Sequence, residues 1–362
     1  MRLIYFSPVL YKSYAQRPHY MVRNLLLSRI DRVLWLEPYP TRLPQLLDFR
    51  LGLGKRDAIQ SSEKLETLLV SALPIEPLPG GAFLNQFLKW RNVRKRLRDF
   101  AGDGLCMIGV GRPSQLAVWA LDNLPHSRSF FDAMDDFPAF YRGLSAMSMT
   151  RRELRVAAMV NEIYCSSHAL LDKYRKYGTS AQLMLNGYNM TDLPDPLPPG
   201  SRKIIGYIGS IAQWFDWPLV LEIAEALPGV TVRLIGPEFI PRPSKLPANI
   251  EIWPECSQSD ATQYVRQFAV GLIPFMRSHL TDCVDPIKYY EYRALGVPVW
   301  STEFGEMKMR GERDAVFKIA PGTNWKLAYA GITEAMQMAV EGVPSVRLSF
   351  DWTKRFKPLL ES

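Results

Sequence analysis

The chain alternates short apolar runs with longer amphipathic segments. The short runs are rich in Val, Ile, Leu and Tyr, as buried strands are, and most are followed by apolar residues that recur with helical period. In the first half the predicted strands cover 3–7, 33–37, 105–110, 129–132 and 162–166, with a further one near 67–71. In the second half they cover 203–208, 230–235, 250–253, 270–274 and 297–301. Strands that alternate with helices predict a parallel sheet in each half, and therefore a doubly wound α/β fold.

A proline-rich segment separates the two halves. Residues 191–203, TDLPDPLPPGSRK, contain four prolines and a glycine, which can continue neither a helix nor a central strand. We therefore predict an N-terminal domain over 1–190, a linker over 191–203, a C-terminal domain over 204–344 and a terminal segment over 345–362. Open parallel sheets bind ligands beyond the carboxyl ends of their strands, so a cleft is the expected site.

Composition agrees with a folded chain of two domains. A length of 362 residues exceeds one ordinary core, and 47% hydrophobic with 22% charged residues excludes disordered, collagen-like and coiled-coil classes. No apolar run approaches the roughly 20 residues that span a bilayer. The N-terminal sequence also lacks a signal-peptide cleavage site, so a cytoplasmic protein is expected.

The positive charge lies in the first half. Residues 1–190 hold 26 Lys and Arg against 16 Asp and Glu, a net charge of +10, whereas 191–362 hold 18 against 20, a net −2. This asymmetry favours an anionic partner for the first half. Nucleic acid is disfavoured because no recognition motif accompanies the cations.

One basic segment is amphipathic at helical spacing. Within 83–100 the apolar positions Trp90, Val93, Leu97 and Phe100 share a face, opposite a set of cations: Arg91, Arg94, Lys95 and Arg98. Such a helix can pack its apolar face on the domain and turn its cations toward anionic lipid. A solvated basic helix is an equally open interpretation. A second basic stretch follows at 142–155.

Two segments in the second half suggest a nucleotide site. The run KIIGYIGS ends a strand at Gly209 and Ser210, where free backbone N–H groups could hold phosphate, although any tight α/β turn has this pattern. Further on, Pro286 is placed to open a helix that Gly296 ends. Lys288 and Glu291 lie one turn apart on that helix, and an exposed ion pair is the ordinary alternative for them.

The string DPIKYYEYRALGVPVWST at 285–302 resembles the donor-site helix of GT-B glycosyltransferases. The similarity is greatest to family four and to bacterial exopolysaccharide enzymes of the xanthan glucuronosyltransferase and teichuronic acid types. Five other strings resemble further segments of the same enzymes: GYIGS at 206–210, LIGP at 234–237, LNGYN at 185–189, QRPH at 16–19 and FFDAMDDF at 130–137. The resemblance implies two Rossmann-like domains facing a cleft, with a C-terminal helix over 345–362 that crosses back to the N-terminal domain.

The resemblance also implies roles for individual residues. Glu291 would accept hydrogen bonds from ribose hydroxyls, and Lys288 would neutralise the diphosphate, as a carboxylate and an ammonium can. Four more residues complete the implied donor site: Gly209, Ser210, Arg277 and Thr281. Arg17 and His19 are the candidates for the acceptor side of the cleft.

One position departs from the retaining members of family four. They carry a glutamate eight positions before the helix glutamate, where this chain has Cys283, and a thiol cannot replace a carboxylate's hydrogen bonds. An inverting transfer is therefore expected. The acidic turn at 132–136 resembles that of the xanthan glucuronosyltransferase type, which implies Asp135 as the general base, with Asp132 and Asp136 as further catalytic candidates. Helix capping is the alternative for these three acids.

No metal or other cofactor is expected. The acidic cluster has the pattern D-x-x-D-D instead of the short D-x-D that holds a divalent ion, and the four cysteines are widely spaced. Lys288, helix N-termini and Arg277 would stabilise the leaving diphosphate.

The implied function is transfer of a sugar from a nucleotide-diphosphate donor, uridine-linked, to a lipid-linked or growing cell-surface polysaccharide. The enzyme would work as a peripheral protein on the inner face of the cytoplasmic membrane. Two alternatives stay open: a nucleotide-sugar epimerase of the same fold, and a partner subunit that has lost catalysis.

Overall fold

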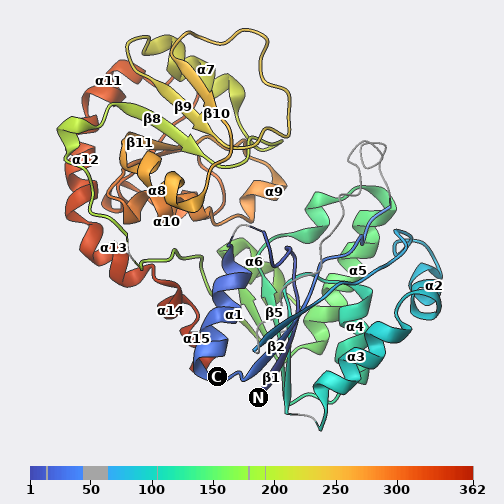
Figure 1. Cartoon of the computed structure of the whole chain (residues 1–362). Helices are drawn as coiled ribbons and strands as arrows, with labels where there is room; N and C mark the ends of the chain where they lie inside the picture. The colour runs from blue at the N-terminus through green and yellow to red at the C-terminus, as the bar shows by residue number, and fades with distance from the viewer. Residues whose placement is uncertain (14, 44–63, 104, 178–179, 192, 362) are drawn as a thin grey trace. The chain divides into compact units, whose positions relative to one another are not determined.

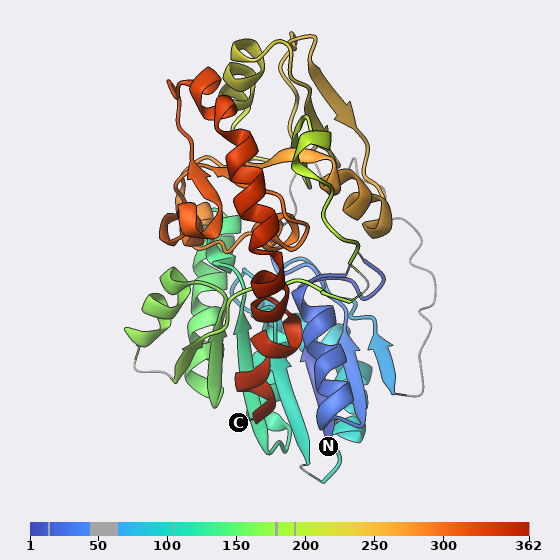
Figure 2. The same ribbon diagram turned by 90° about the vertical axis from the view of Figure 1, so that its left-hand side faces the viewer.

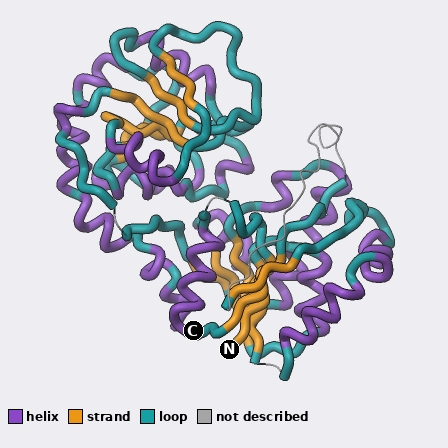
Figure 3. Tube along the Cα trace, in the orientation of Figure 1, coloured by secondary structure: helices purple, strands orange, loops and turns teal. Residues whose placement is uncertain are grey.

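The computed structural model describes residues 1–13, 15–43, 64–103, 105–177, 180–191 and 193–361. They form two compact units, the first made of Met1–Leu185 and Phe356–Ser362 and the second of Asn186–Arg355. Figure 3 shows that each unit contains its own sheet. The first unit therefore ends five residues before the predicted limit at 190. The segment 191–203 belongs to the second unit, and its residue 192 lies outside the described residues.

The first unit is built on a seven-stranded sheet with the order β3-β2-β1-β4-β5-β6-β7, in which all neighbours are parallel. The strands are β1 (Arg2–Phe6), β2 (Arg32–Leu36), β3 (Leu65–Leu68), β4 (Cys106–Val110), β5 (Arg128–Ala133), β6 (Glu162–Cys165) and β7 (Ala181–Leu183). The sequence missed β7 because this edge strand has three residues and buries none of them fully.

Helices cover both faces of the first sheet. The helices are α1 (Arg17–Ser28), α2 (Gly81–Leu88), α3 (Arg91–Ala101), α4 (Gln115–Asn123), α5 (Gly143–Met159), α6 (His168–Arg175) and α15 (Lys357–Glu361). Figures 1 and 2 show α1 and α15 on one face and α3, α4 and α5 on the other. The segment 83–100 is two helices and not one, because Trp90 turns into the core and is fully buried between them.

The second unit has a six-stranded parallel sheet with the order β10-β9-β8-β11-β12-β13. Its strands are β8 (Ile204–Ile208), β9 (Val232–Ile235), β10 (Ile250–Trp253), β11 (Phe268–Ile273), β12 (Val299–Ser301) and β13 (Val316–Lys318). Its helices are α7 (Trp217–Ala226), α8 (Gln258–Arg266), α9 (His279–Asp282), α10 (Ile287–Ala294), α11 (Trp325–Ala330), α12 (Ile332–Glu341), α13 (Val343–Ser349) and α14 (Trp352–Arg355). The chain reverses its direction of winding between β8 and β11, where doubly wound sheets form ligand crevices.

The terminal segment 345–362 is not a single helix. It is divided among the end of α13, α14 and α15, and only Phe356 onward belongs to the first unit. There, Arg29 donates to the Leu360 carbonyl, and Arg128 donates to the Leu359 carbonyl at 3.1 Å. These hydrogen bonds attach α15 to the first unit.

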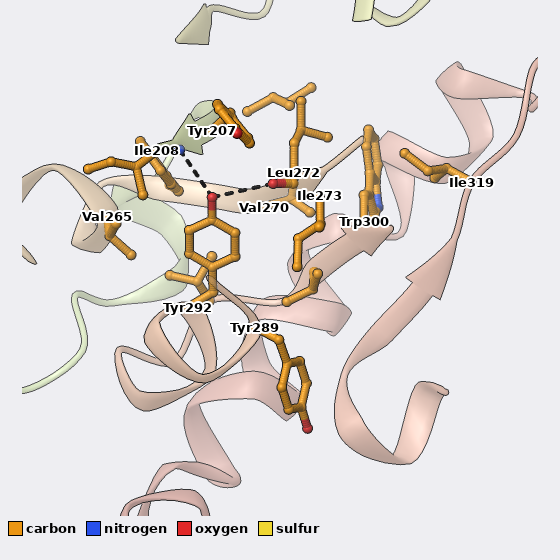
Figure 4. Packing of buried hydrophobic residues seen from close by; sticks show 14 of the residues in the cluster. Tyr207, Ile208, Val265, Val270, Leu272, Ile273, Tyr289, Tyr292, Trp300 and Ile319 are labelled. Atoms are coloured by element: carbon orange, nitrogen blue, oxygen red, sulfur yellow. Dashed lines mark hydrogen bonds between the residues drawn. The ribbon is translucent and has the colours of Figure 1, made fainter. Parts of the chain in front are cut away.

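A tyrosine anchors α10 in the core of the second unit. The Tyr292 hydroxyl accepts a hydrogen bond from the Ile208 N–H at 3.2 Å and donates one to the Leu272 carbonyl at 3.3 Å, as Figure 4 shows. Gly271 leaves room for the ring, since a Cβ there would lie 2.3 Å from Tyr292 Cδ2. The helix is thereby fixed against β8 and β11, the strands on either side of the reversal.

Two glycine turns pack backbone to backbone at the end of the same sheet. Gly209 follows β8 and Gly236 follows β9, with φ of 132° and 139°. A Cβ on Gly236 would lie 2.4 Å from the Gly209 carbonyl oxygen. A side chain at Gly236 would therefore displace the turn that ends β8.

We expect Gly236→Ala to lower the free energy of unfolding by about 1–3 kcal/mol, because it combines an unfavourable φ with a backbone clash. Urea unfolding of the purified protein measures this. Gly229→Ala is the matched control, since a Cβ there meets nothing within 4 Å and its backbone lies outside the left-handed region. Equal effects of the two substitutions would contradict the packing argument.

Candidate functional site

Lys288 brings the two nucleotide-site segments of the second unit together. Its ammonium lies directly over the turn after β8, because a Cβ on Gly209 would be 2.4 Å from Lys288 Nζ. The same nitrogen stands 5.2 Å from the ring centre of Tyr207 and 5.7 Å from that of Phe275. Burial lowers the pKa of Lys288, and Glu291 opposes the shift. The Lys288 ammonium therefore lies near two aromatic rings at the end of a strand. A bound anion there would favour the charged form of the lysine.

Glu291 lies one turn further along α10 and is 7% exposed. Burial raises its pKa to about 7, while Lys288 and a hydrogen bond from Tyr188 act in the opposite direction. The Tyr188 hydroxyl donates that bond to Glu291 Oε1 over 3.4 Å, a long distance. A buried carboxylate with one weak donor can still accept hydrogen bonds from a diol.

The turn at 185–189 is fixed by an aspartate. Asp285 Oδ2 accepts hydrogen bonds from the Asn186 N–H and the Tyr290 hydroxyl, each at 2.7 Å, and Asp285 Oδ1 pairs with Arg310 at 2.6 Å. The Asn186 amide in turn donates to the Asp285 carbonyl at 2.6 Å. Asp285 thus holds the turn that supplies Tyr188, a contribution that sequence reasoning missed.

The remaining implied donor residues have other surroundings. Thr281 is 1% exposed, and its hydroxyl donates to the Met276 carbonyl at 2.7 Å within the capping box of α9. Arg277 is exposed and pairs with Asp282, with Nε 4.0 Å from Oδ1. Ser210 uses its carbonyl to accept a hydrogen bond from Tyr207 at 2.7 Å. The structure thus brings together Gly209, Lys288 and Glu291, whereas Thr281 and Arg277 have other partners.

In the first unit, Asp132 and Arg17 form a buried ion pair. Arg17 Nε and Nη2 donate to Asp132 Oδ1 at 2.9 and 2.8 Å, and Nη1 donates to the Met184 carbonyl at 2.7 Å. Arg17 is 1% exposed and Asp132 is fully buried. The sequence predicted Arg17 as a cleft residue and Asp132 as a catalytic acid. In the structure the two side chains pair with each other at the end of β5.

Asp136 is also paired. Its Oδ1 accepts a hydrogen bond from Lys173 Nζ at 2.8 Å, and the same ammonium contacts Glu153 of α5 at 2.5 Å. Asp136 is 4% exposed and precedes the short 3-10 helix Phe137–Phe140 without capping it through its side chain. Lys173 of α6 was not identified from the sequence, because no local motif links it to the acidic cluster.

Asp135 differs from its two neighbours. It is partly exposed, and within the described chain its carboxylate has no ion-pair or hydrogen-bond partner. Burial raises its pKa to about 7, with further raising by Asp132 and Asp136 and an opposing effect of Arg17. A carboxyl group with this pKa is suited to accept a proton near neutral pH.

His19 shapes the loop before α1. Its Nδ1 accepts a hydrogen bond from the Gln16 N–H at 3.1 Å, and its Nε2 bonds to the Tyr11 carbonyl at 3.0 Å. Burial lowers the pKa of His19, so the neutral ring is favoured. Both ring nitrogens are occupied inside the unit.

Comparisons with known proteins define the fold. No model of a known protein family matches the sequence. HepE of Anabaena, solved with UDP-glucose, superimposes with a TM-score of 0.69 over 100% of this chain and 98% of its own, at 13% identity. The chain has the GT-B fold. Sucrose-phosphate synthase of Thermosynechococcus elongatus gives 0.70 over 99% and 97%, at 14% identity. These matches confirm the predicted fold class of this GT-B chain.

A sequence relative matches part of the chain. TuaH of Bacillus subtilis, provisionally named a teichuronic acid biosynthesis glycosyltransferase, is 27% identical over 168 residues. The match covers 41% of this chain and 42% of TuaH.

In the described part of this GT-B chain, no helix is both long and apolar enough to cross a membrane.

The raised pKa of Glu291 predicts a pH dependence of stability. Between the ordinary value of 4.5 and about 7, the folded protein retains a proton that the unfolded chain loses, so the free energy of unfolding falls as pH rises through this window. Glu291→Gln should remove part of that fall, measured as the change in Tm between pH 5 and pH 8. Exposed Glu334→Gln is the control, and identical pH profiles for both variants would contradict the assigned shift.

Proposed function

We propose that this chain is a glycosyltransferase that moves a sugar from a uridine-diphosphate donor to a lipid-linked or growing cell-surface polysaccharide. The observation that carries the proposal is the position of the Lys288 ammonium over Gly209, with Glu291 one turn away. Several structures with the same fold hold uridine nucleotides, among them HepE with UDP-glucose and an E. coli trehalose-6-phosphate protein with UDP-2-fluoro glucose. The partial match to TuaH supports a cell-surface glycan as acceptor.

The donor would be held by two opposite charges. The diphosphate would lie against Lys288 and the backbone N–H groups of the turn at Gly209 and Ser210, while Glu291 would accept hydrogen bonds from the ribose hydroxyls. Hydroxyl donors favour the ionised carboxyl, so donor binding would lower the pKa of Glu291 from about 7. Binding of the nucleotide and loss of a proton are thereby coupled.

An inverting transfer agrees with the surroundings of Cys283. The thiol is buried, and both neighbouring acids are already paired, Asp282 with Lys308 at 2.5 Å and Asp285 with Arg310. Asp285 is buried in its ion pair and is therefore not available as the missing carboxylate next to the donor sugar. In the proposed step the acceptor oxygen forms a bond to the anomeric carbon, the bond from that carbon to the β-phosphate oxygen breaks, and Asp135 takes the hydroxyl proton. Lys288 would compensate the charge on the departing diphosphate.

The proposal includes transfer without a metal ion or other cofactor. It also places the enzyme in the cytoplasm, on the inner face of the cytoplasmic membrane, where a nucleotide donor and a lipid-linked acceptor can meet. Transfer that persists in a chelator supports the first point. Conversion of the donor alone into an epimer would instead favour the epimerase.

Lys288→Met and Glu291→Gln should each weaken UDP binding at least tenfold, because each removes one of the two charged contacts to the nucleotide. Isothermal titration with UDP measures the dissociation constants. The exposed residues Lys326 and Glu334 provide the matched controls Lys326→Met and Glu334→Gln, which should bind as the unmodified protein does. If both site variants bind UDP normally, the donor-site assignment is wrong.

Asp135→Asn should reduce transfer by about 10²–10⁴-fold while UDP affinity stays unchanged, because the amide cannot take the acceptor proton. Transfer is measured as labelled sugar passing from a panel of UDP-sugars to a lipid extract of the host cell. In the unmodified protein, kcat/KM should fall below pH of about 7, where Asp135 becomes protonated. Exposed Asp172→Asn is the control. An active Asp135→Asn variant would exclude Asp135 as the base, and an inactive parent would favour the non-catalytic subunit.

A further inference from the structure

Helix α2 presents a row of apolar side chains to solvent. Phe83, Leu84, Phe87 and Leu88 are 61%, 47%, 65% and 65% exposed, within a helix of eight residues. The rings of Phe83 and Phe87 lie against each other with their centres 4.5 Å apart. Single exposed apolar residues are common on protein surfaces, but a contiguous row of this kind marks an interaction site.

The opposite side of α2 is firmly attached to the first unit. Asn85 is fully buried and exchanges two hydrogen bonds with the Leu73 backbone, accepting from its N–H at 2.7 Å and donating to its carbonyl at 3.0 Å. Gly81 packs against the Ile75 carbonyl, where a Cβ would lie 1.9 Å from the oxygen. The helix is therefore held in an orientation that turns its apolar row outward.

The next helix, α3, carries exposed cations close to α2 in sequence. In α3, the apolar face predicted from the sequence is buried, which confirms that this helix packs on the unit. Arg94 donates to the Gln86 carbonyl at 3.0 Å and so joins α3 to α2. The exposed cations near the junction are Lys89, Arg91, Lys95 and Arg98.

We propose that α2 and α3 form a docking surface for an anionic bilayer. The row on α2 would enter the interfacial region of the lipid, and the cations of α3 would meet the phosphate headgroups. A second copy of the chain fits less well, because a symmetric interface would bring the same cations face to face. The biological reason for membrane binding rests on the proposed function, because a lipid-linked acceptor lies at a membrane surface. The surface itself requires no donor chemistry.

Vesicle flotation of the full chain tests the inference. Phosphatidylcholine vesicles that contain phosphatidylglycerol should bind the protein at low salt and release it at high salt, whereas phosphatidylcholine alone should bind it weakly. Two double variants should each reduce vesicle binding at least tenfold: Phe83→Ser with Phe87→Ser, and Arg91→Gln with Lys95→Gln. For the second variant, each cation removed should weaken binding about fivefold. Leu105→Ser is the matched control, because Leu105 is 75% exposed elsewhere on the same unit.

Three results would overturn the docking surface. The first is unchanged vesicle binding by the double serine variant, and the second is equal binding to vesicles with and without phosphatidylglycerol. The third is a dimer in sedimentation that this variant converts to a monomer, which would make α2 a contact between copies. All variants should keep the parent's Tm and its UDP affinity. Vesicle binding by a parent that does not bind UDP would leave this surface standing and reject the proposed function.

Discussion

The second unit depends on placing a lysine ammonium over a glycine turn beside a buried carboxyl group. Lys288 can occupy this position because Gly209 has no side chain and because Tyr207 and Phe275 provide aromatic faces around the nitrogen. Tyr292 fixes the helix that carries the lysine, through hydrogen bonds to the two strands at the reversal of the sheet. Local sequence, core packing and the charge of the site therefore converge on α10.

The acidic cluster of the first unit shows how neighbours in sequence acquire different chemistry. Asp132 and Asp136 each face a cation from a distant element, Arg17 in one case and Lys173 in the other. Their charges are compensated, whereas Asp135 between them has a raised pKa. The two paired acids hold the end of β5 and contribute to the electrostatic environment of the third.

The sequence predicted the parts of the structure that rest on local pattern. Long apolar runs identified the central strands, and proline and glycine marked the ends of α10. The edge strands β7 and β13 have three residues each, too few for a periodic signal. The partners of Arg17 and Asp136 could not be inferred, because ion pairs between residues 115 and 37 positions apart leave no trace in local spacing. The break between α2 and α3 was also missed, since its cause is the burial of Trp90 against Tyr39.

The attachment of α15 to the first unit has a consequence for how the molecule is made. Arg29 and Arg128 reach their carbonyl partners only in a segment that leaves the ribosome after the whole second unit. The N-terminal sheet can form earlier, but the face beside α1 stays uncovered until translation has passed residue 356. The first unit, whose strands are synthesised first, therefore receives α15 only after the second unit has been synthesised.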